Sequence, residues 1–242
     1  MALISIKLDQ VAALRSLRQR KQPDPVQAAV LAELAGADGV ACQLREDRQY
    51  IRDRDVYLLR EIVKTRLNLY MAPVDELYQR AIEVKPYMVT LMPFSDEQVA
   101  VRNGIDFEEN RDLYAEFAGS LKEAGICACY FVDPDADAVK AAARAKVDAV
   151  ELNAFPYVSS ETVDAAETEL ERIEQTAQLA LKLGISAHCG NNLDYKNIRP
   201  LVKFGIVDEF TVGHAIISRG LLVGLDRAVR EIVDIVHPSN AG

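Results

Sequence analysis

Short apolar runs alternate along the chain with longer stretches in which apolar residues recur every three or four positions. Short runs of this kind are typical of buried strands, and the longer spacing is typical of amphipathic helices. The spacing of Leu170, Ile173, Ala177 and Leu181, for example, places all four on one predicted helix face. The pattern as a whole predicts eight strands, at residues 3–8, 39–43, 67–71, 88–92, 126–132, 149–152, 185–189 and 209–212.

Strands that alternate with helices predict a parallel sheet. Glycines mark several points where a predicted helix ends and the next strand begins, as at Gly36, Gly125 and Gly184, which is typical of helix C-caps. The 242 residues show no Gly/Ser linker or break in composition, and a (β/α)8 barrel typically needs ~250 residues. We therefore expect α/β architecture with a single TIM-barrel domain over residues 1–242, in which the tail 237–242 is disordered.

One connection is unusually long. Residues 93–110 follow the fourth predicted strand and show little helical pattern of their own. Loops of this length in compact domains are usually functional or disordered, and loops that follow barrel strands lie at the catalytic face. We expect this loop to be a lid.

Composition limits the partners. Lys+Arg 28 against Asp+Glu 37 gives a net charge of −9, and no basic run offsets it, which argues against a nucleic-acid partner. No apolar run is long enough to cross a bilayer, and the start of the chain does not resemble a signal peptide. The four cysteines lie in apolar runs without a CxxC pair, which favours a reducing compartment. We expect a cytoplasmic protein that binds no membrane.

Several motifs occur in a fixed order. The sequence Pro-Asp-Pro-Val-Gln-Ala-Ala occupies residues 23–29, Leu-Arg-Glu-Asp-Arg occupies 44–48, and Gly-His-Ala-Ile-Ile occupies 213–217. Their order and spacing resemble the pyridoxine 5'-phosphate synthase (PdxJ) family from residue 3 to about 230. The resemblance implies a (β/α)8 barrel that assembles into oligomers, commonly octamers. It also implies condensation of 3-amino-2-oxopropyl phosphate with 1-deoxyxylulose 5-phosphate, without a metal or an organic cofactor.

Part of the family's substrate site is retained. Asp9, Arg18 and Arg45 match positions that bind the phosphorylated substrates in the family, and Gly213 and His214 match its phosphate site. Backbone N–H groups at the start of a helix suit an anion, although a tight turn capped by His214 is the alternative for this motif. Glu151 also matches a family Glu. It is a candidate base, with a salt bridge to an inward Lys or Arg as the alternative.

The family's acid–base groups are replaced. Gln43, Tyr70 and Asn191 stand where the resemblance places a catalytic His, Glu and His, and Asn192 replaces the neighbouring Gly. Amide side chains do not titrate, and removing a positioned acid or base typically costs ~10²–10⁴ in rate. Since the replacements are polar, we expect Asn191 and Asn192 to bind substrate in a remodelled site. The remaining departures are Lys7 for Asn, Gln10 and Tyr50 for His, Ala100 for Thr, and residues 153–155 for His-Thr-Gly.

Among these departures from the family pattern, Lys7 is the one that adds a new reactive group. Side chains alternate along a strand, so Lys7 and Asp9 point the same way, into the mouth of the predicted barrel. A lysine at this place can form a Schiff base with a ketone, pair with Asp9, or bind an anion. The candidate catalytic residues are therefore Lys7, Asp9, Tyr70 and Glu151, whereas we expect His188 and Cys189 to be core residues.

These residues favour a diverged enzyme that acts on a phosphorylated or other anionic keto or amino substrate, by condensation or ring formation. One alternative is a non-catalytic relative that binds a phosphorylated ligand. Another is an authentic pyridoxine 5'-phosphate synthase of vitamin B6 biosynthesis. The expected partners are a small anionic metabolite and further copies of the chain, as a dimer or larger assembly up to an octamer, since long amphipathic helices such as 164–183 offer surface for contact.

Overall fold

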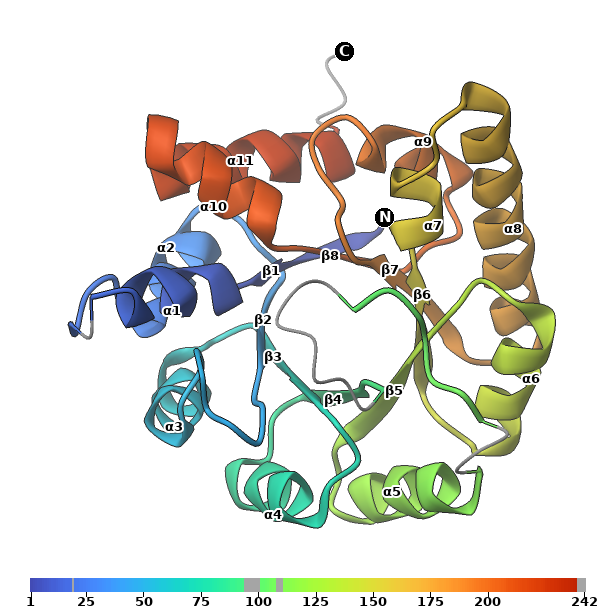
Figure 1. The fold of residues 1–242 in the computed structure, drawn as a ribbon, viewed down its shortest axis with the longest axis horizontal. Helices are drawn as coiled ribbons and strands as arrows, with labels where there is room; N and C mark the ends of the chain where they lie inside the picture. Colours follow the sequence, from blue (N-terminus) through green and yellow to red (C-terminus); the bar gives the residue numbers. More distant parts are fainter. Residues whose placement is uncertain (19, 94–100, 108–110, 239–242) are drawn as a thin grey trace.

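A computed structural model describes residues 1–18, 20–93, 101–107 and 111–238. The strands are parallel and close into a barrel in chain order (Figure 1). Each predicted strand is present, with bounds that differ from the prediction by at most one residue. The strands are β1 (Leu3–Lys7), β2 (Gly39–Gln43), β3 (Arg66–Met71), β4 (Met88–Leu91), β5 (Cys127–Val132), β6 (Ala149–Asn153), β7 (Ser186–Gly190) and β8 (Glu209–Val212).

Helices surround the barrel on its outside (Figure 1). The glycines expected to end helices do so: Gly36, Gly125 and Gly184 all have the positive φ that favours glycine. The helices are α1 (Asp9–Ser16), α2 (Pro25–Leu34), α3 (Asp53–Ile62), α4 (Asp75–Val84), α5 (Arg111–Glu123), α6 (Ala136–Arg144), α7 (Phe155–Val158), α8 (Val163–Lys182), α9 (Ile198–Phe204), α10 (His214–Val223) and α11 (Leu225–Val236). Together with the strands they confirm the predicted (β/α)8 barrel.

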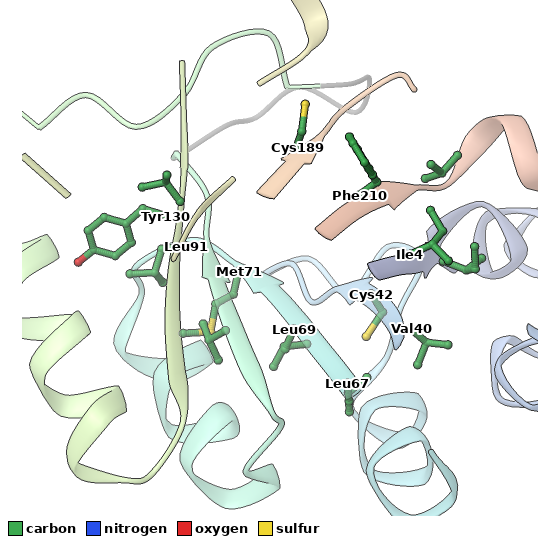
Figure 2. Packing of buried hydrophobic residues seen from close by; sticks show 14 of the residues in the cluster. Ile4, Val40, Cys42, Leu67, Leu69, Met71, Leu91, Tyr130, Cys189 and Phe210 are labelled. Carbon is green, nitrogen blue, oxygen red and sulfur yellow. The ribbon is translucent and has the colours of Figure 1, made fainter. Parts of the chain in front are cut away.

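The hydrophobic core fills the layer between strands and helices. On β3, Leu67, Leu69 and Met71 belong to this layer (Figure 2), whereas Tyr70 points into the barrel interior. Cys189 is part of the same core, as expected, and burial raises the pKa of its thiol. The thiol therefore stays protonated and unreactive.

The buried face of α8 differs from the prediction at one residue. Ala180 is fully buried, but Leu181 is 43% exposed. With 3.6 residues per turn, a residue seven positions after Ile173 lies about 20° from it around the helix, and a residue eight positions after lies about 80° from it. Leu181 therefore rotates off the face that it was predicted to share.

A buried ion pair joins α1 to α3. Arg15 donates two hydrogen bonds to Asp55, at 2.8 and 2.6 Å, and a third to the Tyr50 carbonyl at 2.8 Å. The side chains of Arg15 and Asp55 are 3% and 0% exposed. Arg15 is therefore committed to the fold and is not available to an anionic ligand.

Polar side chains also fill the barrel interior at the amino ends of the strands. Ser5 Oγ donates to Glu209 at 2.6 Å, and His188 lies beside Glu209 in the sheet. Burial lowers the pKa of His188, which keeps the imidazole neutral. His188 is buried as predicted, and its Nδ1 has no hydrogen-bond partner among the described residues.

The first and last strands meet at the barrel seam. β1 pairs with β8 from Leu3↔Glu209 to Ile6↔Val212, which closes the ring. His237, which was placed in the expected disordered tail, lies with its Nε2 2.7 Å from the Ala2 carbonyl, and residues 239–242 lie outside the described part. None of the described helices is both long enough and apolar enough to cross a bilayer.

Candidate active site

A cavity of about 450 Å³ opens at the carboxyl ends of the strands, the face that carries active sites in TIM barrels. The barrel brings most of the predicted site residues together there. Arg18 is different: it lies exposed on the turn after α1 and is not among the residues that line the cavity. The predicted residues in the lining are Lys7, Asp9, Gln43, Arg45, Tyr70, Glu151, Asn191, Asn192, Gly213 and His214.

Lys7 and Asp9 form one side of the cavity. Lys7 Nζ lies 3.6 Å from Asp9 Oδ2 and 4.0 Å from the centroid of the Tyr70 ring. Asp9 Oδ1 accepts the Gln43 backbone N–H at 2.7 Å. Burial is the largest influence on Asp9 and raises its pKa, while the Lys7 charge acts in the opposite direction. The carboxylate is therefore a better proton acceptor than an exposed one.

Glu151 lies at the base of the cavity. The Tyr70 hydroxyl donates a hydrogen bond to its carboxylate and lies 3.1 Å from Thr211 Oγ1. Burial raises the pKa of Glu151 to about 7, against the opposing effects of the Tyr70 hydrogen bond and the Lys7 charge. A carboxyl group with this pKa can both accept and donate a proton near neutral pH. Tyr70 acts as a donor only, because burial and the neighbouring Glu151 raise its pKa far above neutrality.

Gly190 makes room for the Glu151 carboxylate. A Cβ atom at Gly190 would lie 2.4 Å from Glu151 Oε1, closer than van der Waals contact allows. Sequence reasoning missed both Gly190 and Thr211. Thr211 could have been found, since it stands between the apolar residues Phe210 and Val212 on the last strand and therefore faces the other way, into the barrel.

Residues 101–107, from the predicted lid, lie against the carboxyl end of β5, and we call them the strap. The Ile105 N–H donates to the Phe131 carbonyl at 2.9 Å, and a Cβ at Gly104 would lie 2.3 Å from the Asp133 nitrogen. Val101 lines the cavity and packs on an apolar cluster that includes Tyr70 and Phe131. The rest of the predicted lid, at 94–100 and 108–110, lies outside the described residues.

Two asparagine side chains hold the strap. Asn191 Nδ2 donates to the Val101 carbonyl at 2.7 Å and to Asn153 Oδ1 at 2.9 Å. Asn153 Nδ2 donates to the Arg102 carbonyl and to Asp133 Oδ1, both at 2.8 Å. Both donor hydrogens of Asn191 are therefore used within the protein. The side chain was predicted to bind substrate, and its main described contacts instead position the strap.

Replacing Asn191 by alanine removes two of these hydrogen bonds, each of which typically contributes about 1 kcal/mol. We expect faster hydrogen exchange at Ile105, whose N–H bonds the Phe131 carbonyl, and faster tryptic cleavage after Arg102. The matched control is Asn192→Ala, because Asn192, like Asn191, lines the cavity and has a positive φ. This control should leave the exchange unchanged. Equal exchange at Ile105 in the parent and Asn191→Ala proteins would contradict this role.

The predicted phosphate site lies where β8 leads into α10. Gly213 is the N-cap residue of α10, so the first N–H groups of this helix lack helical partners and can face an anion. His214 is exposed, with Nε2 3.2 Å from Ser218 Oγ. Arg45 reaches the cavity from the loop after β2 and pairs with Asp47 at 3.1 Å. Within the described ranges, no group of three or more His, Cys, Asp or Glu side chains is arranged to hold a metal ion.

Comparison with known proteins gives matches over nearly the whole chain. A family model described as "Pyridoxal phosphate biosynthesis protein PdxJ" matches residues 4–238. The "Pyridoxine 5'-phosphate synthase" of Geobacter sulfurreducens is 43% identical over 236 residues, which cover 98% of this chain and 99% of the relative. The protein of the same name from Geotalea uraniireducens is 44% identical over 236 residues, with the same shares of the two chains.

Solved structures show the same fold at low sequence identity. "Native KDPGal structure" has a TM-score of 0.66 at 14% identity and covers 98% of this chain and 95% of its own. Phosphoribosyl anthranilate isomerase from Thermus thermophilus has a TM-score of 0.62 at 13% identity, with 98% of both chains covered. KGPDC from Streptococcus mutans has a TM-score of 0.67 at 9% identity and covers 98% of both chains. At these identities the likeness concerns the fold alone.

Proposed function

The chain belongs to the PdxJ family, and from this membership we propose that it is an enzyme that condenses a phosphorylated ketone with an amino compound in the cavity at the barrel mouth. The relatives named pyridoxine 5'-phosphate synthase, at 43% and 44% identity, make that reaction the first candidate. Its substrates would be 3-amino-2-oxopropyl phosphate and 1-deoxyxylulose 5-phosphate, as the family resemblance implies.

The Glu151 carboxyl group is the observation that carries this proposal. Ring-forming condensation requires protons to move repeatedly between carbon, nitrogen and oxygen. Glu151 faces the cavity with a pKa of about 7 and is held by the Tyr70 hydroxyl. A group with this pKa can serve as base in one step and as acid in the next. Asp9 offers a second buried carboxyl group in the same cavity.

The phosphate group of the substrate would bind where β8 leads into α10, next to Lys7, because a Cβ at Gly213 would lie 3.2 Å from Lys7 Cβ. We assign it to the first N–H groups of α10 at Gly213 and His214, with Arg45 as a further cationic contact. Barrels commonly bind phosphate near the last two strands, at the start of a helix. The apolar cluster beneath Val101 would then face the carbon skeleton of the substrate.

A second candidate is a condensation of a different keto or amino substrate, by a changed acid–base mechanism. The observation that favours it is the set of replacements at Gln43, Tyr70 and Asn191. None of these side chains can act as a base near neutral pH, and Asn191 instead holds the strap. Proton transfer would then depend on Asp9 and Glu151. A non-catalytic relative that binds a phosphorylated ligand in the same cavity is the outcome to exclude.

Growth of a strain that lacks pyridoxine 5'-phosphate synthase, and product formation from the two family substrates by the purified protein, test these candidates together. Growth without pyridoxine, with product formed in vitro, supports the first candidate. Binding of 1-deoxyxylulose 5-phosphate in calorimetry without product, followed by turnover of another phosphorylated ketone, supports the second. Binding without turnover of any phosphorylated ketone indicates the non-catalytic relative, and no binding contradicts the proposal.

We further propose that the chain acts in the cytoplasm and self-associates. Large apolar side chains are exposed on α2, on α10 and on the turn after α1, and α1 contacts both of these helices. The most exposed side chains in these three places are Leu17 at 78%, Leu34 at 69%, Leu221 at 70% and Leu222 at 81%. Sedimentation of the purified protein is expected to show a dimer or a larger assembly, and Leu221→Glu with Leu222→Glu is expected to shift it toward the monomer. A monomeric parent protein would contradict this.

A further inference from the structure

We propose that Lys7 is a nucleophile that forms an iminium ion with the carbonyl carbon of a phosphorylated ketone. The inference rests on the proposed function, because it places the ketone of that reaction in the same cavity. The family resemblance has Asn at this position, so the step would distinguish this chain from the family pattern.

The barrel places the Lys7 amino group inside the cavity and away from bulk water. Lys7 is the last residue of β1, lines the cavity, and has only 20% of its side chain exposed. A Cβ at Gly213 would lie 3.2 Å from Lys7 Cβ, so the glycine leaves room for the lysine stem. The Tyr70 ring lies against the ammonium group, with its centroid 4.0 Å away. The nitrogen is thus held at a defined place beside the substrate space.

A proton acceptor for the ammonium group lies beside it. Asp9 Oδ2 is 3.6 Å from Lys7 Nζ, and burial raises the pKa of this carboxyl group. The Gln43 N–H fixes the other oxygen of Asp9 at 2.7 Å. A lysine becomes nucleophilic when an adjacent base removes its proton. The ion pair is therefore also the arrangement that can supply the free amine.

The covalent step balances without any other reactant. The Lys7 ammonium gives one proton to Asp9, and the free amine attacks the ketone carbon. The carbonyl oxygen takes this proton from Asp9, and a second proton from the nitrogen follows by the same route. The oxygen then leaves as water while the nitrogen lone pair forms the C=N bond. The net change is ammonium plus ketone to iminium plus water.

The next step would use Glu151. Its carboxylate takes a proton from the carbon next to the iminium carbon, and the electron pair of that C–H bond forms an enamine. The enamine carbon is the nucleophile that a condensation needs. Glu151 is connected to Lys7 through Tyr70, whose hydroxyl binds Glu151 and whose ring contacts the ammonium group. The base and the nucleophile are thus linked through one side chain, Tyr70, inside the same cavity.

Reductive trapping tests the proposal. The purified full chain is incubated with dihydroxyacetone phosphate or 1-deoxyxylulose 5-phosphate and sodium cyanoborohydride, and the modified residue is mapped by mass spectrometry. We expect one adduct, on Lys7, that saturates with ketone concentration. Lys7→Arg should bind the ketone in calorimetry but form no adduct. The matched control is Lys203→Arg, at an exposed position on α9, which should keep the adduct.

The outcomes separate this proposal from the proposed function. Binding of a ketone without an adduct on Lys7 overturns the iminium and leaves the proposed function standing. An adduct spread over several exposed lysines, unchanged in Lys7→Arg, also overturns it. No binding of either ketone contradicts both proposals. Mapping on the parent protein decides the question even if Lys7→Arg does not fold.

Discussion

Glu151→Gln is expected to slow the proposed condensation by about 10²–10⁴-fold, the usual effect of losing a positioned acid–base group. Glutamine has nearly the same shape and can still accept the Tyr70 hydrogen bond, so the cavity should be preserved. Substrate binding should therefore change much less than kcat. Steady-state kinetics of the parent and variant proteins, with calorimetry of ketone binding, measure the two effects separately.

The same change is expected to stabilise the protein at high pH. In the folded protein the pKa of Glu151 is about 7, whereas an unfolded chain has a Glu pKa of ~4.3. Between these values the folded state keeps a proton that the unfolded state has released, so stability falls as pH rises from about 4.5 to 7. The loss at Glu151 is on the order of 3 kcal/mol and should be absent in Glu151→Gln.

Urea unfolding at pH 5 and pH 8 tests this expectation. The parent protein should lose more stability between the two pH values than Glu151→Gln does. Glu161→Gln, at an exposed position, is the matched control and should behave like the parent protein. A Glu151→Gln variant that converts substrate at the parent rate would show that this carboxyl group is not the acid–base group. A variant that is no more stable than the parent protein at pH 8 would also count against this assignment.

Asp55→Ala is expected to lower the free energy of unfolding by about 3–5 kcal/mol, because it leaves the buried Arg15 guanidinium without its partner. The loss should appear as a lower urea midpoint with an unchanged slope. Asp226→Ala is the control, since Asp226 and Arg230 form an exposed ion pair and its loss should change the midpoint little. A similar midpoint for the two variants would mean that the buried pair does not hold α1 on α3.

The fold could be predicted from the local sequence pattern, but the site could be predicted only in part. Each strand is buried on both faces of the sheet, so it appears in the sequence as a continuous apolar run. The strand ends can therefore be predicted from the polar residues at which these runs stop. The residues at the cavity came from the family resemblance and the barrel geometry. Their partners did not: Tyr70 meets Glu151 across 81 positions of sequence, and Asn191 meets Val101 across 90. Such pairings depend on strand stagger and loop path, which periodicity does not encode.

Arg18 and Asn191 show two different limits. Arg18 keeps the family's residue, yet its helix turn leaves the side chain exposed and outside the cavity lining. Asn191 is at the cavity as predicted, but its donor hydrogens go to Val101 and Asn153. Matching positions therefore indicated where most side chains lie, but not which group each one binds.

The seam between the first and last strands has a consequence for synthesis of the chain. Leu3 pairs with Glu209, so one edge of β1 has no partner until β8 has been translated. At ~5–20 residues per second, that edge waits roughly 10 to 40 seconds on the ribosome. An unpaired strand edge is a template for aggregation, so the nascent chain should need chaperone protection during this interval. A stall late in the message, before the codons of β8, should then be more harmful than a stall of equal length after them.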